Sequence, residues 1–212
     1  MFRPIILLCA LFALSSADNG FDAIHPISTT SFQCLVNNAT FFITRVWEGR
    51  GVYDPNGFQN LKNAATAGFK QMDAYFDLCT RGNCSAAANQ VEGAINRLKT
   101  ENIAIGTLWF RVERREWHDN STINQQHVLD MTAQADKMGQ AAGIFTNSRY
   151  WTEIMGADFT SVSKYPLWWE EHDKHADFST FQPFGGWTSA KLHQYAKQTK
   201  ICNHQVEQDV SA

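Results

Sequence analysis

The chain has 212 residues, with 18 Lys and Arg against 21 Asp and Glu and a formal net charge of −3. This balance argues against a nucleic-acid-binding protein, which normally carries a basic surplus. The length is enough for one well-filled domain rather than several.

The first 17 residues have the features of a secretory signal peptide. Arg3 precedes an apolar run over residues 5–14, and residues 15–17 form a small-residue cleavage site. The apolar run is too short to span a bilayer, and no later stretch is apolar enough to do so. We therefore expect residues 18–212 to form one secreted domain, extracellular or in the lumen of a secretory compartment, with no membrane association.

Four cysteines remain once the predicted signal peptide is removed: Cys34, Cys79, Cys84 and Cys202. An even count in a secreted chain predicts two disulfides, and four cysteines allow three pairings. Cys79 and Cys84 bracket a short loop, which would leave Cys34 and Cys202 to tie the two ends of the domain together. A zinc site is the competing interpretation, but the four cysteines do not form two close pairs.

Two of the three sequons predict N-glycosylation of a secreted chain, since a disulfide at Cys84 would hinder the third, Asn83-Cys84-Ser85. The two are Asn38-Ala39-Thr40 and Asn120-Ser121-Thr122. Each is expected in a surface loop, where an acceptor asparagine is accessible.

Strand and helix patterns alternate along most of the chain. Strands are predicted over residues 20–24, 40–47, 69–76, 103–109 and 141–145, and helices over 28–36, 58–68, 85–99, 121–139 and 147–155. At least four repeats of this kind predict parallel strands with helices outside them. This alternation then stops, because no comparable helix is predicted between the strands over 165–169 and 192–196. Composition alone does not separate a barrel from an open sheet.

A dense charge cluster follows the apolar strand over 103–109: Arg111, Glu113, Arg114, Arg115 and Glu116. Barrels and open α/β sheets place their chemistry at the carboxyl ends of such strands. Arg111 and Glu113 are two residues apart, so their side chains leave the same face of the strand. The functional interpretation is a carboxylate held beside a cation at the mouth of a pocket. The alternative is the solvated end of a strand.

Carboxylates follow four of the predicted strands: Asp22, Asp77, Glu113 and Asp173, with Glu170 and Glu171 beside the last. In a barrel they would converge on one mouth. Two carboxylates about 5 to 10 Å apart are what glycosidic cleavage requires, one of them protonated to act as the acid.

Aromatic residues crowd the later strand ends, and flat indole faces stack well on sugar rings. We expect about half of them to be packing residues instead. The set comprises Trp109, Trp117, Tyr150, Trp151, Trp168, Trp169 and Trp187.

Other catalytic chemistries find little support. His172 and His175 lie three residues apart with no third ligand indicated, so we expect no metal and no other cofactor. No Gly-x-Ser-x-Gly motif is present to place a serine nucleophile.

Taken together, the chain resembles the lysozymes of glycoside hydrolase family 25, most closely the secreted nematode and amoeba branch. The matching segments run in order through nearly all of the chain after the signal peptide: 20–24, 86–98, 106–113, 143–147, 166–173, 184–187 and 194–195. The resemblance implies an α/β fold, an irregular TIM-like (β/α) barrel of about eight strands and five helices. It also implies bacterial peptidoglycan or a related amino-sugar glycan as partner, cut at the N-acetylmuramic acid linkage, and a monomer acting in defence against or digestion of bacteria.

The resemblance also implies the site residues. The family signature is a strand ending in Asp-x-Glu, and it assigns the general acid to Glu113, with Asp22 as the acid of the first strand. Apart from the resemblance, we expect substrate-binding roles for five residues at the predicted strand ends: Trp109, Trp168, Trp169, Asp173 and Arg111. Near the C-terminus, where the family has another Asp, Glu207 is the nearest match.

Arg111 stands where the family signature has its Asp. A general acid must hold its proton near the working pH, and an arginine within about 6 Å lowers a carboxyl pKa by roughly 1 to 3 units. The same cation would repel an oxocarbenium-like transition state, and an ion pair with Glu113 would occupy the acid. The leading hypothesis is therefore a peptidoglycan-recognising protein with weak or lost muramidase activity. The alternatives are an active muramidase that uses Glu113 and Asp22, and a glycan-binding defence protein without turnover.

Overall fold

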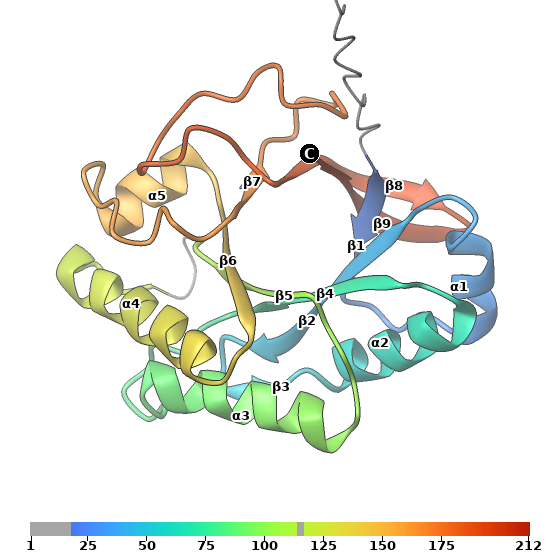
Figure 1. The fold of residues 1–212 in the computed structure, drawn as a ribbon, viewed down its shortest axis with the longest axis horizontal. Helices are drawn as coiled ribbons and strands as arrows, with labels where there is room; N and C mark the ends of the chain where they lie inside the picture. Colours follow the sequence, from blue (N-terminus) through green and yellow to red (C-terminus); the bar gives the residue numbers. More distant parts are fainter. Residues whose placement is uncertain (1–17, 114–116) are drawn as a thin grey trace, which may run out of the picture.

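Eight strands close into a barrel in this computed structural model, which describes residues 18–113 and 117–212 (Figure 1). The predicted signal peptide and residues 114–116 of the charge cluster lie outside the described residues. The strands are β1 (Asn19–Asp22), β2 (Phe41–Glu48), β3 (Val52–Tyr53), β4 (Gln71–Phe76), β5 (Thr107–Arg111), β6 (Ala141–Thr146), β7 (Leu167–Glu170), β8 (Leu192–Ile201) and β9 (His204–Ser211). The helices are α1 (Thr29–Leu35), α2 (Pro55–Ala67), α3 (Ala87–Thr100), α4 (Ser121–Lys137) and α5 (Ser148–Met155).

The barrel follows the chain order for most of its circumference. Strands β1, β2, β4, β5, β6, β7 and β8 pair in parallel, and β9 closes the ring because it pairs antiparallel with both β8 and β1. The two-residue β3 forms a hairpin with β2 outside this ring. The helices lie outside the strands (Figure 1). The predicted irregular barrel is confirmed, and its irregular part is the helix-free passage from β7 through β9.

Side chains alternate between the inside and the outside of the barrel, as the pleat of a strand requires. Seven buried residues fill the interior: Phe41, Ile43, Tyr75, Trp109, Phe145, Trp168 and Leu192. A larger cluster lies between the strands and the helices, including Phe42 and Phe76 on the strands and Leu61 and Ile95 on the helices. The filled interior leaves the carboxyl ends of the strands as the place for a site.

Gly57, in the first turn of α2, lies directly against the backbone of β2. A Cβ at this position would lie 1.6 Å from the carbonyl oxygen of Arg45. A backbone carbonyl cannot move aside as the end of a flexible side chain can. Because of this steric clash, we expect Gly57→Ala to lower the free energy of unfolding by about 3 kcal/mol. Gly82→Ala is the matched control, because a Cβ there meets nothing within 4 Å. Urea unfolding of both variants is the measurement, and equal midpoints would contradict this packing.

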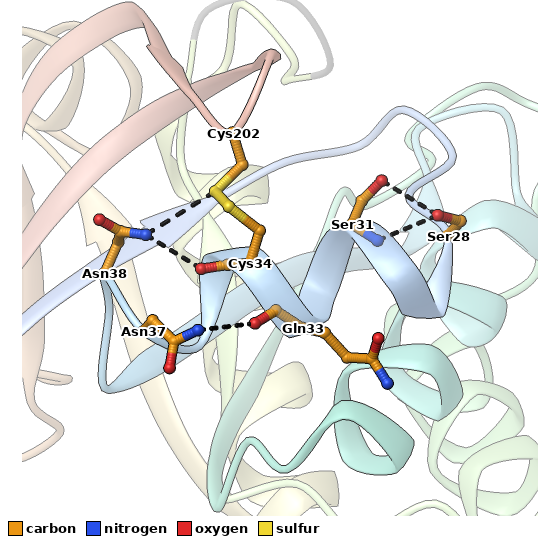
Figure 2. The surroundings of a disulfide bond; sticks show 7 residues. All are labelled: Ser28, Ser31, Gln33, Cys34, Asn37, Asn38 and Cys202. Carbon is orange, nitrogen blue, oxygen red and sulfur yellow. Dashed lines mark hydrogen bonds between the residues drawn. A yellow bond between two sulfur atoms is a disulfide. The ribbon is translucent and has the colours of Figure 1, made fainter.

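The four described cysteines pair as Cys34–Cys202 and Cys79–Cys84. Figure 2 shows the first pair, which joins the last turn of α1 to the turn between β8 and β9. Asn38 lies beside it and donates from Nδ2 to the carbonyl oxygen of Cys34 at 2.9 Å. The long disulfide therefore anchors the β8–β9 hairpin, which forms one wall of the barrel mouth.

The two predicted glycan acceptors lie in different settings. The Nδ2 of Asn38, the atom that would carry a glycan, is engaged with Cys34 and lies 3.7 Å from the Sγ of Cys202. Asn120 caps α4 through its Oδ1, which accepts from the backbone N–H groups of Thr122 and Ile123. Attachment at the nitrogen of Asn120 leaves that cap in place, so Asn120 is the acceptor that a glycan would disturb less. Within the described residues, no helix is long and apolar enough to span a bilayer.

Candidate active site

A cleft runs across the barrel mouth, where the carboxyl ends of the parallel strands meet. It consists of two adjoining cavities of about 350 Å³ and about 540 Å³. Arg111, Glu113 and Lys197 line both cavities and so lie on the divide between them. The Arg111–Glu113 segment therefore lies at the centre of the cleft, as the charge cluster predicted.

Arg111, the last residue of β5, is held mainly by Asp77, which follows the neighbouring strand β4. Its Nε and Nη2 donate to the two carboxylate oxygens of Asp77 at 2.6 and 2.7 Å. Its Nη1 lies 3.3 Å from Oε2 of Glu113, and its guanidinium lies over the Tyr75 ring. Arg45 adds a second cation, 3.5 Å from Asp77. The guanidinium thus faces into the cleft, and its bidentate ion pair is with Asp77 rather than with Glu113.

Glu113 holds its proton more tightly than a free carboxyl does. Burial raises the pKa of Glu113 to about 7, because the charged form loses its water; Arg111 acts in the opposite direction, and Glu170 adds to the rise. The prediction that Arg111 would lower this pKa on balance is therefore wrong. The cation's effect is real, but desolvation and a neighbouring carboxyl group outweigh it. Glu113 is consequently able to carry a proton at mildly acidic pH.

Glu170, the last residue of β7, faces Glu113 across the cleft and is 3% exposed. The two carboxyl groups are close enough that Glu170 disfavours the ionised form of Glu113 and so raises its pKa. Lys197 of β8 donates to Glu170 at 2.7 Å, and Asn147 donates to it at 3.3 Å. The sequence placed Glu170 among the acids following β7 but gave no role to it, and no motif marked Lys197. The only sequence feature that could have identified either residue as part of the site was the position of Glu170 at the end of a predicted strand.

Asp22, at the end of β1, lies in the base of the smaller cavity. Gln194 donates to its Oδ2 at 2.6 Å, and Asp209 of β9 lies close enough to raise the free energy of the charged form; Oδ2 of Asp209 is buried without a hydrogen-bond partner among the described residues. Burial raises the pKa of Asp22 to about 8, against the hydrogen bond from Gln194, with Glu207 adding to the rise. Asp209 is fully buried and receives the Trp168 N–H at 2.8 Å. Sequence comparison had pointed to Glu207, which does line the cavity, but Asp209 is the residue in contact with Asp22. The two-residue spacing in β9 places both on one face.

This buried acid pair predicts a fold that loses stability as the pH rises. The unfolded chain releases the Asp22 proton near its ordinary pKa of 3.8, whereas the folded chain keeps it up to about 8. The contribution of Asp22 to the free energy of unfolding is therefore complete at low pH and is lost as the pH rises from about 4 to about 8. We expect the free energy of unfolding to fall by on the order of 3 kcal/mol from pH 5 to pH 8. Urea unfolding at both pH values is the measurement.

The matched controls are Asp22→Asn, which should flatten the slope, and Asp158→Asn, which replaces an exposed acid and should not. Equal slopes in all three proteins would contradict this assignment.

The three tryptophans predicted to bind substrate do not line the cleft. Trp109 and Trp168 are 1% and 0% exposed inside the barrel, and Trp169 is covered by His193 and Phe181. The structure therefore gives these three tryptophans packing roles, because no indole face is open to a ligand. Two other aromatic residues of the predicted set, Trp117 and Tyr150, line the larger cavity.

Asp173 also lies away from the cleft. It accepts hydrogen bonds from the Thr180 hydroxyl at 2.6 Å and the His175 N–H at 2.8 Å, in the loop after β7. It lines neither cavity of the cleft, so its contacts order this loop. His172 contacts Gln194 at 2.9 Å, and among residues 18–113 and 117–212 no group of three or more His, Cys, Asp or Glu side chains is arranged to hold a metal ion.

Known proteins share both the sequence and the fold. The family model described as lysozyme-like protein 1 matches residues 13–195. The chain is 37% identical to lysozyme-like protein 5 of Caenorhabditis elegans, over 93% of this chain and 92% of that protein. It is 34% identical to probable GH family 25 lysozyme 2 of Dictyostelium discoideum, over 94% and 95% of the two chains.

A solved structure, muramidase from Trichobolus zukalii, superimposes with a TM-score of 0.70 at 20% identity, over 92% of this chain and 94% of that one. At this identity the likeness concerns the fold, and it is the same barrel. The sequence matches, which cover almost the whole chain, carry the family assignment. The chain belongs to the lysozyme-like proteins of glycoside hydrolase family 25, a family of glycosidases.

Proposed function

We propose that this protein is a secreted peptidoglycan-binding member of the family whose muramidase activity is weak or absent, and that it acts in defence against or digestion of bacteria. The observation that carries the proposal is the Arg111 guanidinium, which lies within the cleft, bound to Asp77 and 3.3 Å from Glu113. The proposal includes a monomer that needs neither cofactor, nucleic acid nor membrane.

The surroundings of Glu113 allow it to be protonated, but their charges do not favour glycosidic cleavage. Glycosidic cleavage passes through an oxocarbenium-like transition state, which nearby negative charge stabilises. Asp77 is neutralised by its bidentate contact with Arg111, and Glu170 is paired with Lys197. Asp22, with its pKa near 8, is neutral at the acidic pH at which Glu113 is protonated. A proton donor is present, but the charge beside it has the wrong sign for the developing cation.

Two assays on the same cell walls test this proposal. Turbidity of Gram-positive walls measures lysis, and sedimentation with insoluble peptidoglycan measures binding. We expect binding together with lysis at least about 100-fold slower than that of a family 25 muramidase whose Asp-x-Glu signature is intact. Lysis at a comparable rate would overturn the proposal.

An active muramidase is the second candidate, with Glu113 as general acid and Asp22 assisting. The raised pKa of Glu113 favours it, because a general acid must be protonated at the working pH. It predicts release of reducing ends that declines as the pH rises past about 7. Binding without any release of reducing ends would instead favour the third candidate, a glycan-binding defence protein without turnover.

A further inference from the structure

The cleft at the barrel mouth is electrically polarised along its length. Among the residues that the structure describes, four carboxylates and two Lys or Arg side chains line the smaller cavity. The larger cavity is lined, within the same residues, by three carboxylates and five Lys or Arg side chains, and we refer to it as the basic half. Two of its five cations, Arg111 and Lys197, are shared between the cavities, whereas Arg45, Arg50 and Arg81 belong to the basic half alone.

The carboxylates of the basic half do not cancel this charge. Asp77 is shared by Arg111 and Arg45, and Arg45 also pairs with the buried Asp54 at 2.8 Å. Glu48 pairs with Arg50 at 2.6 Å, yet the Arg50 side chain is 63% exposed at the rim. Arg81 is also exposed and lines the same cavity. Because Arg45 pairs with Asp54 and Lys197 pairs with Glu170, the positive charge open to a ligand lies at the rim, on Arg50 and Arg81.

The same space has aromatic walls. Trp117 and Tyr150 line the basic half, and both are partly exposed. Aromatic rings suit the apolar face of a sugar, and guanidinium groups suit a planar carboxylate, which they bind with two parallel hydrogen bonds. This combination fits a sugar ring that carries an acidic group better than it fits a neutral sugar.

We propose that the basic half binds an amino sugar through a carboxylate attached to that sugar, with Arg50 and Arg81 as the specificity-determining residues. This inference rests on the proposed function, since it takes the amino-sugar glycan as the ligand of the cleft. In peptidoglycan the carboxylate belongs to the lactyl group of N-acetylmuramic acid or to the peptide attached there. The bound carboxylate orients the glycan, because the basic half offers it five Lys or Arg side chains and the smaller cavity offers only two among the described residues.

Two monosaccharides that differ by the lactyl group provide the test: N-acetylmuramic acid and N-acetylglucosamine. Neither contains a glycosidic bond, so the result does not depend on whether the protein hydrolyses peptidoglycan. We expect NMR titration of the wild-type protein in low salt to give a dissociation constant about 10-fold lower for N-acetylmuramic acid, a gap that narrows as salt is added. N-Acetylglucosamine 6-phosphate is the third ligand, and an equal gain from its phosphate would overturn the assignment to a carboxylate.

The variant Arg50→Gln/Arg81→Gln should reduce that preference to less than about 2-fold while leaving N-acetylglucosamine binding unchanged, which also shows that the variant is folded. The matched control is Lys70→Gln/Lys191→Gln, which removes two charges at the opposite end of the barrel and should keep the preference. Equal wild-type affinities for the two sugars, or a preference that survives in the arginine variant, would overturn the inference. Lysis of cell walls, which tests the proposed function, is measured separately.

Discussion

The Arg111→Asp variant is expected to lyse peptidoglycan at least about 100-fold faster than the wild-type protein, since one well-placed charge at a transition state changes rates by about 10² to 10³. The substitution removes a guanidinium whose Nη1 lies 3.3 Å from Glu113 and puts a carboxylate, on a shorter side chain, at the same backbone position. It also releases Asp77 from its two-pronged contact. Both changes place negative charge where the sugar ring becomes positive.

The acid that donates the proton need not change in this variant. Burial and Glu170 already hold the pKa of Glu113 at about 7 against the pull of Arg111, so removing the cation should raise it further. The assay is therefore run at about pH 5, where the carboxyl is protonated. Release of reducing ends from purified walls is the measurement, with the wild-type protein alongside.

Arg111→Met is the matched control for this prediction, because it removes the cation without supplying an acid. We expect its rate to lie between those of the wild-type protein and Arg111→Asp, provided that thermal melting shows all three to be folded. Arg45 remains 3.5 Å from Asp77 in each variant and limits the repulsion that a new carboxylate would create. Identical rates in the three proteins would show that Arg111 does not control the chemistry.

Removal of the Cys34–Cys202 disulfide is expected to have the largest effect on stability. Cys34→Ser/Cys202→Ser should lower the free energy of unfolding by about 5 kcal/mol, because the bond closes a segment with a sequence separation of 168. The bond restricts the unfolded chain, and a longer closed segment loses more entropy. Urea unfolding under non-reducing conditions is the measurement.

Cys79→Ser/Cys84→Ser serves as an internal comparison, since this bond has a sequence separation of only 5. The same relation gives a loss of about 2 kcal/mol. The long disulfide also anchors the hairpin that brings Lys197 and Glu207 to the cleft. Equal losses in the two double variants would mean that chain entropy does not explain the stabilisation.

The alternating part of the fold was predictable from local pattern. Apolar runs and helical spacing located the strands and helices from β1 to α5 within a few residues, because each pattern reflects burial of one face or of both. The predicted strand over 192–196 is instead the ten-residue β8, and β9 was not predicted. Both belong to a polar hairpin, where many side chains are exposed, so the alternation of apolar and polar residues that would identify a strand is weak.

The orientation of the aromatic side chains could not be predicted from the sequence. Composition indicates that tryptophans near strand ends can stack on sugars, but not which face of the strand each one occupies in the closed barrel. Trp109 and Trp168 point inward and bind Asp73 and Asp209 through their N–H groups, whereas Trp117 lines the cleft. The choice depends on register between strands that are far apart in sequence.

By itself, the sequence determined the alternation of strands and helices as far as α5 and the spacing of Arg111 and Glu113 at the end of one strand, because these follow from local pattern; the barrel followed from the resemblance to family 25. Only the tertiary structure decided how those two groups behave. Asp77 binds Arg111 from the neighbouring strand, while burial and Glu170 raise the pKa of Glu113 to about 7. The charge state of a side chain depends on the water it loses and on the neighbours it gains, and both are set by the packing of strands distant in the chain.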